Sequence, residues 1–438
     1  MSEGRHPRFG IRWTIVALLF FATTISYVDR QVLGILAPTL QRALRWSERD
    51  YGAIVSWFSF AYGFGLLVMG RVLDVIGTKR GFSISIVVWS AAAMATARAT
   101  TATGFGMTRA LLGLGEAGNF PASLKAISEW FPRRERALAV GIFNAGSNVG
   151  AIVAPLTVPA IAITWGWRAA FVATGAIGFV WLAFWLALYR EPELHPWLEA
   201  RELAYIRSDP VESPRPVPWT SLLARRETWA FAAGKALTDP VWLFYLFWLP
   251  KFLDANWGVK LTGLAAPLVA IYLTADVGSV AGGWVSGRLI ARGWRTSRAR
   301  KTAMLIAALL ILPTAFAPFA SSLWIAVSLV AVAAAAHQWW SANLYTTVSD
   351  NFPRQSVASV VGIGGFAGAM SAMLFQRATG VLLDRTGGGY GVVFAICGSA
   401  YVVALLVIHL LSPRGDVGDS GHPFIGAPAP SRPTSGST

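Results

Sequence analysis

Long apolar runs dominate this chain of 438 residues, and they constrain its fold more than any other feature. A helix needs ~20 apolar residues to cross a bilayer core, and the runs are about that long. None alternates with period two as a barrel strand would, so the sequence predicts transmembrane helices. The predicted spans lie at approximately 13–36, 51–70, 81–98, 103–127, 137–163, 168–189, 228–252, 262–289, 302–320, 322–347, 357–383 and 388–411.

A polar, proline-rich stretch, 190–227, divides the twelve predicted spans into six and six. The sequence therefore predicts an all-α membrane protein made of two pseudo-symmetric six-helix bundles, 1–189 and 228–411. Residues 190–227 are predicted to be a cytoplasmic linker with at most a short surface helix. The tail, 412–438, is rich in Gly, Pro and Ser and is predicted to be a disordered cytoplasmic segment.

The charges are distributed as in a membrane protein. Charged residues make up 13% of the chain, against roughly 25% in soluble domains. The net charge is +15, but the Lys and Arg residues cluster in short segments between apolar runs, unlike the basic face of a nucleic-acid-binding domain. These segments follow the second, fourth and eighth spans, which predicts cytoplasmic termini. The first run is too long for a signal peptide, so we expect it to be retained.

The two halves share a sequence motif. Phe-Pro-Arg occurs at 131–133 and again at 352–354, and each copy is followed at the same spacing by Val-Gly-Ile. Parallel halves with a common loop motif are typical of transporters that bind a solute between the halves, near mid-membrane. Extending this alignment back without gaps places Glu116 opposite His337.

Four ionisable residues lie in the predicted first and fourth spans. Asp29 and Arg30 are adjacent, while Arg109 and Glu116 lie two turns apart on one helix face. Charges at bilayer depth are costly and usually face a protein interior or a solute pathway. We expect Asp29 to pair with Arg109, and Arg30 to pair with Glu116 or with a substrate. The alternative is a structural charge network that locks the two helices together.

Several motifs resemble those of a known family. The stretch 70–81, Gly-Arg-Val-Leu-Asp-Val-Ile-Gly-Thr-Lys-Arg-Gly, resembles the signature of the major facilitator superfamily. Tyr-Val-Asp-Arg at 27–30, the stretch 109–116 and Asn-Phe-Pro at 119–121 resemble its anion:cation symporter branch. The stretches 237–252 and 337–350 are similar to those of bacterial hexuronate transporters.

This resemblance implies the major facilitator fold and a secondary active transporter, not an enzyme. It implies a multi-pass protein of the bacterial inner membrane that acts as a monomer on protons and a small organic anion, without a cofactor, a metal or nucleic acid. Asp29 and Glu116 match the carboxylates that carry the coupled proton in that branch. Arg30 and Arg109 match the arginines that serve the anion and the gating network.

A sugar acid needs a cation for its carboxylate and polar groups for its hydroxyls. Arg30 is the expected carboxylate ligand, because a guanidinium can bind a carboxylate through two parallel hydrogen bonds. The other predicted substrate-binding residues are Tyr27, Tyr62, Arg109, Asn144, Ser147, Asn148, His337, Gln338, Trp340 and Asn343. The structural alternatives are aromatic packing for Tyr62 and Trp340, interhelical hydrogen bonds for the asparagines, and a satisfied buried histidine for His337.

Two further groups are predicted to act in gating. The first group is Gly70, Asp74, Gly77, Lys79 and Arg80 in the superfamily motif. Asp74 can bridge to a helix end or a cation, and the two glycines allow close helix approach. The second is Lys235 and Asp239, which stand four apart and can pair. For this pair a structural or gating role ranks first and substrate binding second.

The expected function is proton-coupled uptake of a hexuronate, galacturonate or glucuronate. Another carboxylate, such as an aldonate or an aromatic acid, is the alternative cargo, and export is the alternative direction. A membrane enzyme is the distant alternative. It is disfavoured because the sequence shows no His/Cys metal cluster, no phosphate-binding Gly loop and only one cysteine, Cys397. The internal repeat argues against a channel.

Overall fold

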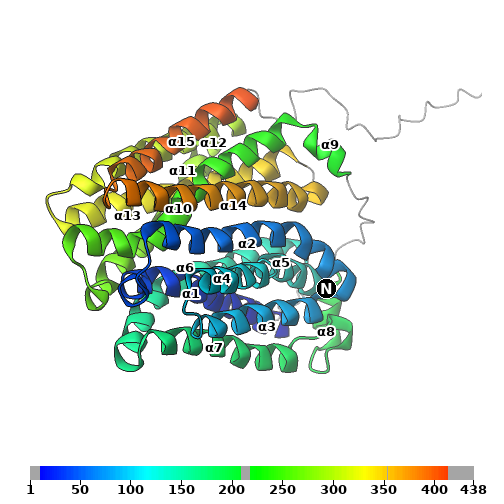
Figure 1. Ribbon diagram of the computed structural model, residues 1–438. Coiled ribbons are helices and arrows are strands. Elements are labelled where there is room, and N and C mark those ends of the chain that lie inside the picture. Colours follow the sequence, from blue (N-terminus) through cyan, green and yellow to red (C-terminus); the bar gives the residue numbers. More distant parts are fainter. Residues whose placement is uncertain (1–9, 209–217, 353, 413–438) are drawn as a thin grey trace, which may run out of the picture.

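The computed structural model describes residues 10–208, 218–352 and 354–412, and these residues form helices joined by loops, without a strand (Figure 1). The first half contains α1 (Ile11–Leu44), α2 (Glu48–Ile76), α3 (Thr78–Thr96), α4 (Ala102–Glu116), α5 (Asn119–Trp130), α6 (Arg133–Trp165) and α7 (Trp167–Leu188). The connecting segment contains η1 (Pro192–Leu194), α8 (Ala200–Ile206) and α9 (Trp219–Leu223). The second half contains α10 (Arg226–Trp257), η2 (Leu261–Gly263), α11 (Ala265–Ala291), α12 (Thr296–Ile311), η3 (Leu312–Phe319), α13 (Leu323–Asn351), α14 (Arg354–Arg385) and α15 (Gly391–Leu411).

These helices account for the twelve predicted spans, and the predicted fold class is confirmed. The fourth span is split, because α4 ends at Glu116 and α5 begins at Asn119. The ninth begins as α12 and ends as the 3-10 helix η3. Within the described residues, nine helical segments are long and apolar enough to cross a membrane by composition alone. The other three spans are short, split or charged: α3, α4 with α5, and α10.

The connecting segment packs against the first half through buried charges. Glu202 of α8 accepts a hydrogen bond from Arg12 Nη1 at 2.8 Å and from the Ile11 amide at 3.2 Å, at the start of α1. Arg12 Nε also donates to Glu135 of α6 at 3.1 Å. The segment thus contains two short α-helices, α8 and α9, where at most one short surface helix was expected, and these bonds anchor α8 to the first half. Residues 209–217 of the predicted linker and 413–438 of the predicted tail lie outside the described residues.

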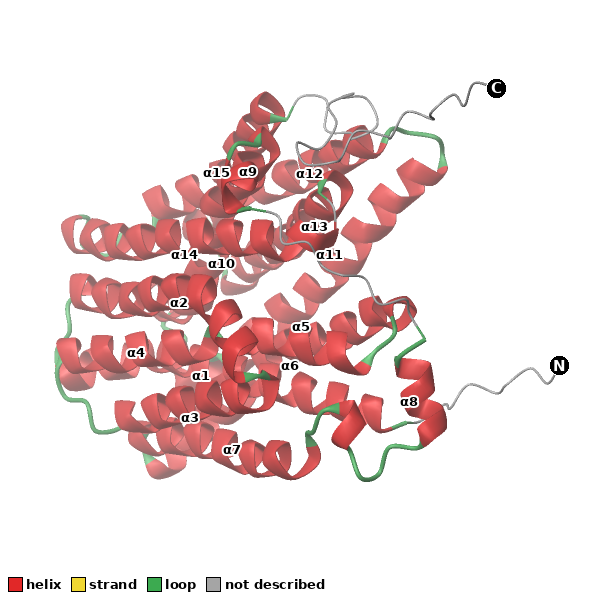
Figure 2. Cartoon of the chain, turned by 90° about the vertical axis from the view of Figure 1, so that its right-hand side faces the viewer, coloured by secondary structure: helices red, strands yellow, loops and turns green. Residues whose placement is uncertain are grey.

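The two halves lie side by side and meet along three helix pairs, α1 with α10, α2 with α14, and α6 with α11 (Figures 1 and 2). We call the end of the molecule that carries the 45–47 loop the loop end. The opposite end, where α1 begins and α15 finishes, is the terminus end. The positions of contacts along α2 and α14 show how the halves are arranged at these two ends.

At the loop end the halves are in close contact. A Cβ on Gly52 of α2 would lie 3.0 Å from the Cα of Gly380 of α14, and one on Gly34 of α1 would lie 2.7 Å from the Leu246 carbonyl oxygen of α10. Lys251 of α10 forms an ion pair with Glu48 of α2. The loop end is therefore sealed by both backbone packing and charge.

The Asp384 carboxylate of α14 reinforces this seal. It accepts hydrogen bonds from the backbone amides of Glu48 and Arg49 at 2.9 and 3.0 Å. The first amides of a helix have no partner within the helix, so a residue of one half here caps a helix of the other. Separation of the halves at this end must break that cap.

At the terminus end the halves diverge, as Figure 2 shows on the side where the N-terminus lies. Along α2 the contacts with α14 continue past Gly63, where a Cβ would meet Ala369, to Leu66, which lies beside Gly365. Next in the same register are Gly70 and Gly362, and a Cβ on either would meet nothing within 4 Å. The protein is thus closed at the loop end and open at the terminus end.

Helix α4 is held between α2 and α3 by small residues. A Cβ on Gly113 would lie 2.5 Å from the Phe58 carbonyl oxygen of α2, and one on Gly115 would lie 2.7 Å from the Trp89 amide nitrogen of α3. Close backbone approach through small residues is the usual way in which membrane helices pack. This packing places Glu116, the last residue of α4, in the centre of the first half.

We expect Gly113→Ala to lower the thermal unfolding temperature of the purified protein by several degrees, because overpacking a tight contact costs about 1–3 kcal/mol. Gly283→Ala is the matched control, since Gly283 is helical with open space around it. Alanine favours a helix over glycine by ~1 kcal/mol, so this variant should be unchanged or slightly more stable. Equal unfolding temperatures for the two variants would contradict the close packing of α4 on α2.

Candidate functional site

The centre of the first half contains a buried ion pair between α1 and α4. Arg30 Nε and Nη2 donate to Glu116 Oε2 at 3.0 and 2.7 Å, and the two residues are 7% and 1% exposed. The expected pairing of Arg30 with Glu116 is thus formed. Glu116 is the last residue of α4, where the helix carbonyls carry partial negative charge. The Arg30 cation compensates both this partial charge and the charge of the Glu116 carboxylate.

Three aromatic rings enclose the Arg30 guanidinium. Its Cζ lies 4.8 Å from the ring centroid of Tyr27, 5.0 Å from that of Phe58 and 4.9 Å from that of Tyr62. A guanidinium over an aromatic face is stabilised by the ring quadrupole, more strongly where water is excluded. We call Arg30, Glu116 and these three rings the aromatic cage.

Phe58 is a member of the cage that sequence analysis missed. It precedes Tyr62 by one turn of α2, and the two rings stack with centroids 5.6 Å apart. The spacing of four residues was the signal that could have revealed it, because such side chains are neighbours on a helix. Phe58 carries no polar group, so nothing in the sequence distinguishes it from the other apolar residues of the span.

Asp29 and Arg109 are close, but they do not form the expected ion pair. Arg109 Nη1 donates to the backbone oxygen of Asp29 at 3.4 Å, and Nη2 donates to the Thr96 hydroxyl at 3.0 Å. Both carboxylate oxygens of Asp29 are buried, and no hydrogen-bond partner for either is found in the described part of the chain. Adjacent residues of a helix point about 100° apart, so Asp29 points away from the aromatic cage.

Among the described residues, the polar side chains of α6 make no hydrogen bond to the aromatic cage. Gly146 and Gly150 press α6 against α1, where their Cβ positions lie 2.3 and 2.5 Å from backbone oxygens. Asn144 and Asn148 lie on the opposite side of α6, by the helix period of 3.6 residues. Ser147 is buried and donates to the Asn144 backbone oxygen at 2.7 Å. Their predicted contact with substrate therefore remains a prediction.

In the second half, three of the four predicted residues of α13 point into the bundle. His337 stacks on Trp242 with centroids 4.8 Å apart, and its Nδ1 meets the Tyr401 hydroxyl of α15. Asn343 Nδ2 donates to the Gly282 carbonyl oxygen of α11 at 3.1 Å. Trp340 is fully buried, edge-on to Tyr401. These contacts match the structural alternative for this face of α13.

A second buried charge cluster joins α10 to α13. Lys235 Nζ lies 2.7 Å from Asp239 Oδ2 and 3.0 Å from the Tyr345 hydroxyl of α13. Gln338, the fourth predicted residue of α13, is half-buried and lies two turns from Tyr345 on the same face. The expected Lys235–Asp239 pair is thus formed, next to the face of α13 that is not packed into the bundle.

A model of the Major Facilitator Superfamily matches residues 19–376. The chain belongs to this superfamily. It is a multi-pass membrane protein of a transporter class, not an enzyme.

Relatives of known name cover most of the chain. A hexuronate transporter of Escherichia coli (strain K12) is 33% identical over 406 residues, covering 91% of this chain and 93% of that protein. A galacturonate transporter of Dickeya chrysanthemi is 35% identical over 282 residues, covering 63% and 81%. The fold is shared with the crystal structure of a bacterial homologue of the human lysosomal transporter Spinster, with a TM-score of 0.71 at 18% identity over 94% of this chain and 96% of that chain.

The superfamily motif between α2 and α3 makes contacts within its own half. Asp74 pairs with Lys125 of α5 at 3.1 Å, and Lys79 donates to the Leu186 carbonyl oxygen of α7 at 2.8 Å. A Cβ on Gly70 or Gly77 would meet nothing within 4 Å. The expected close helix approach is therefore not made in this conformation, and the gating role of the motif remains a prediction. Gly77 is needed for another reason, since its φ of +82° joins α2 to α3. Arg80 is exposed.

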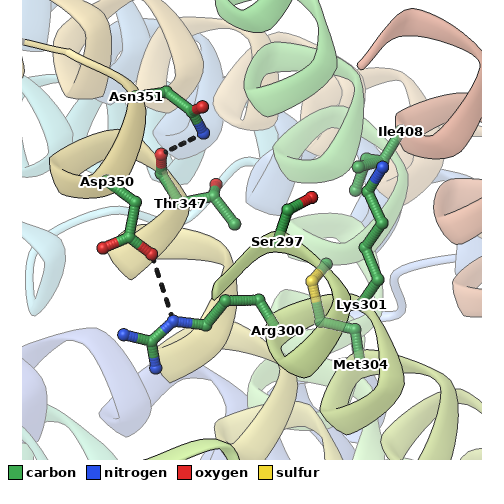
Figure 3. A pocket seen from close by; sticks show the side chains of 8 residues that line it. All are labelled: Ser297, Arg300, Lys301, Met304, Thr347, Asp350, Asn351 and Ile408. Atoms are coloured by element: carbon green, nitrogen blue, oxygen red, sulfur yellow. Dashed lines mark hydrogen bonds and ion pairs between the residues drawn. The ribbon is translucent and has the colours of Figure 1, made fainter. Parts of the chain in front are cut away.

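A small recess at the terminus end of the second half is structural in character (Figure 3). Within it, Arg300 of α12 pairs with Asp350 of α13 at 3.2 Å and donates to the Ser286 hydroxyl of α11 at 2.8 Å. The repeat places Asp350 opposite Glu129, which accepts a hydrogen bond from Thr78 at 2.7 Å. In both halves one carboxylate therefore ties neighbouring helices together. In the part of the chain that the structure describes, no group of three or more His, Cys, Asp or Glu side chains could hold a metal ion.

A double-mutant cycle tests the buried pair. Arg30→Met leaves the Glu116 carboxylate buried without its cation, and breaking a buried ion pair in this way costs about 3–5 kcal/mol. We expect a large drop in the thermal unfolding temperature of the purified protein. The double variant Arg30→Met/Glu116→Gln should recover most of that loss, because no unpaired charge is then buried. If the two substitutions were additive, the side chains would not be coupled.

Proposed function

We propose that this protein is a proton-coupled symporter of a sugar-acid anion, most readily a hexuronate such as galacturonate or glucuronate. The observation that carries the proposal is the buried guanidinium of Arg30, which is held inside three aromatic rings by a protonatable carboxylate, Glu116. The relatives named as hexuronate and galacturonate transporters support the choice of substrate class.

The pairing of Arg30 with Glu116 explains how a proton and an anion can move together. One guanidinium can neutralise one carboxylate, and that carboxylate is either Glu116 or the substrate. When Glu116 takes up a proton, it no longer needs the cation, and Arg30 becomes free to bind the sugar acid through two parallel hydrogen bonds. The site then has the same net charge in both states, because each bound anion is accompanied by one proton.

The other groups of the first half have subsidiary roles in this proposal. Tyr27 and Tyr62 present hydroxyls and ring faces beside Arg30, and we assign them to the sugar ring. Asp29 is a second protonatable group, buried one residue from Arg30. Arg109 holds the backbone of α1 in place through the Asp29 carbonyl oxygen, so we assign it to positioning the site.

Alternating access follows from the asymmetry between the two ends. The loop end is sealed by the Glu48–Lys251 pair and by the Asp384 cap, and these contacts must break when the other state forms. Charged groups are well hydrated once they are exposed, so such a seal can open at modest cost. We place the terminus end in the cytoplasm of a bacterial cell, because the arginine-rich 292–301 segment lies there. The structure then corresponds to an inward-open state.

The test is uptake of labelled galacturonate into proteoliposomes. We expect uptake to increase when the outside is acidified and to collapse when a protonophore removes the gradient. A panel of unlabelled sugar acids, aldonates and aromatic acids, competing in the same assay, identifies the preferred substrate. Uptake that does not respond to a proton gradient would exclude proton coupling.

Glu116→Gln separates coupling from binding. A glutamine cannot take up or release the proton, but it leaves Arg30 available to the anion. We expect this variant to keep counterflow exchange of galacturonate and to lose accumulation driven by the gradient. Loss of both activities in a folded variant would show that Glu116 does not act as the coupling group.

A further inference from the structure

The Lys235 cluster occupies a space that α14 leaves open for it. A Cβ on Gly368 would lie 2.3 Å from Asp239 Oδ2, and a Cβ on Gly364 would lie 2.2 Å from the Phe231 ring and 3.3 Å from Lys235 Cγ. Two glycines one turn apart on α14 therefore face this ion pair. Any other residue at Gly368 would displace the Asp239 carboxylate.

The cluster lies slightly toward the terminus end from the aromatic cage. Gly34 of α1 packs on Leu246 and Phe247 of α10, which sets the relative height of the two helices. Arg30 precedes Gly34 by four residues, and Asp239 precedes Phe247 by eight. At 1.5 Å per residue this difference of four places Asp239 about 6 Å from the level of Arg30 along the helix axes.

The cluster retains unused hydrogen-bonding capacity. The Lys235 ammonium has three N–H donors, of which two meet Asp239 and Tyr345. The Asp239 side chain is 23% exposed and binds the lysine through Oδ2, so its Oδ1 can accept a further hydrogen bond. A free donor and a free acceptor side by side match two neighbouring hydroxyl groups of a sugar.

We propose that Lys235 and Asp239 bind the hydroxyl groups of the substrate, at the end remote from its carboxylate. The inference rests on the proposed function and adds the second half of the site to it. Arg30 then binds the carboxylate of the anion, and the Lys235–Asp239 pair binds its hydroxyl groups. This pair selects sugar acids over carboxylates without hydroxyl groups.

The geometry of α13 supports this assignment. Its buried face, with His337 and Asn343, is occupied by contacts to α15 and α11. The face with Gln338 and Tyr345 is the accessible one, and Tyr345 is 39% exposed while bonded to Lys235. The side chains of the second half that the substrate can reach are therefore Lys235, Asp239 and their neighbours on this face.

The experiment compares two anions of similar ring size, galacturonate and cyclohexanecarboxylate, which has no hydroxyl groups. Binding to purified protein is followed by competition against labelled galacturonate. In the double variant Lys235→Gln/Asp239→Asn, which leaves no buried charge unpaired, we expect galacturonate affinity to fall tenfold or more. Affinity for cyclohexanecarboxylate should stay the same, so that the preference for the sugar acid is lost.

The control is Glu193→Gln/Arg207→Gln, which neutralises an exposed Arg–Glu pair in the connecting segment, away from the interface of the two halves. It should bind both anions as the unmodified protein does. Unchanged galacturonate affinity in the Lys235→Gln/Asp239→Asn variant would overturn the inference alone. An equal loss for both anions, or a lowered unfolding temperature without ligand, would assign the pair a structural role. Failure of the unmodified protein to bind galacturonate would overturn the proposed function as well.

Discussion

Burying one guanidinium opposite one carboxylate is the physical constraint on which the rest of this structure depends. Taking a charge out of water costs several kcal/mol, and the cost is recovered only if the partner is close and well oriented. Arg30 and Glu116 meet this condition at 2.7 Å, inside three aromatic rings. Such a pair tolerates exchange of one carboxylate for another far better than loss of either partner. This property makes a structural ion pair usable as an anion site.

The helices around the pair are arranged to keep it in place while the two halves move. Gly113 and Gly115 hold α4 between α2 and α3, and Gly146 and Gly150 hold α6 on α1. All of these contacts lie within the first half. The contacts between the halves are concentrated at the loop end, where an ion pair and a cap contributed by the opposite half can be replaced by water. The first half can therefore move as a unit against the second, with the aromatic cage intact.

Much of the fold could be predicted from the sequence, because apolar runs of membrane length leave few alternatives to helices. The pairing of Arg30 with Glu116 was also accessible, since charges at bilayer depth must find partners. The sequence could not show which face of α13 points into its bundle, because His337, Trp340 and Asn343 are as polar as a binding face would be. Only the packing of α11 and α15 decides that question. Nor could the sequence show that Asp29 and Arg109 do not form an ion pair. Arg109 donates instead to the backbone oxygen of Asp29 and to the Thr96 hydroxyl.

The central claim is that the substrate carboxylate replaces Glu116 on Arg30, with a proton moving to Glu116. Difference infrared spectroscopy of the purified protein, with and without galacturonate, measures this directly through the carbonyl band of a protonated carboxylic acid. The account predicts that this band appears on adding galacturonate and is absent in Glu116→Gln. No new band in the unmodified protein, or a band that persists in the variant, would contradict it.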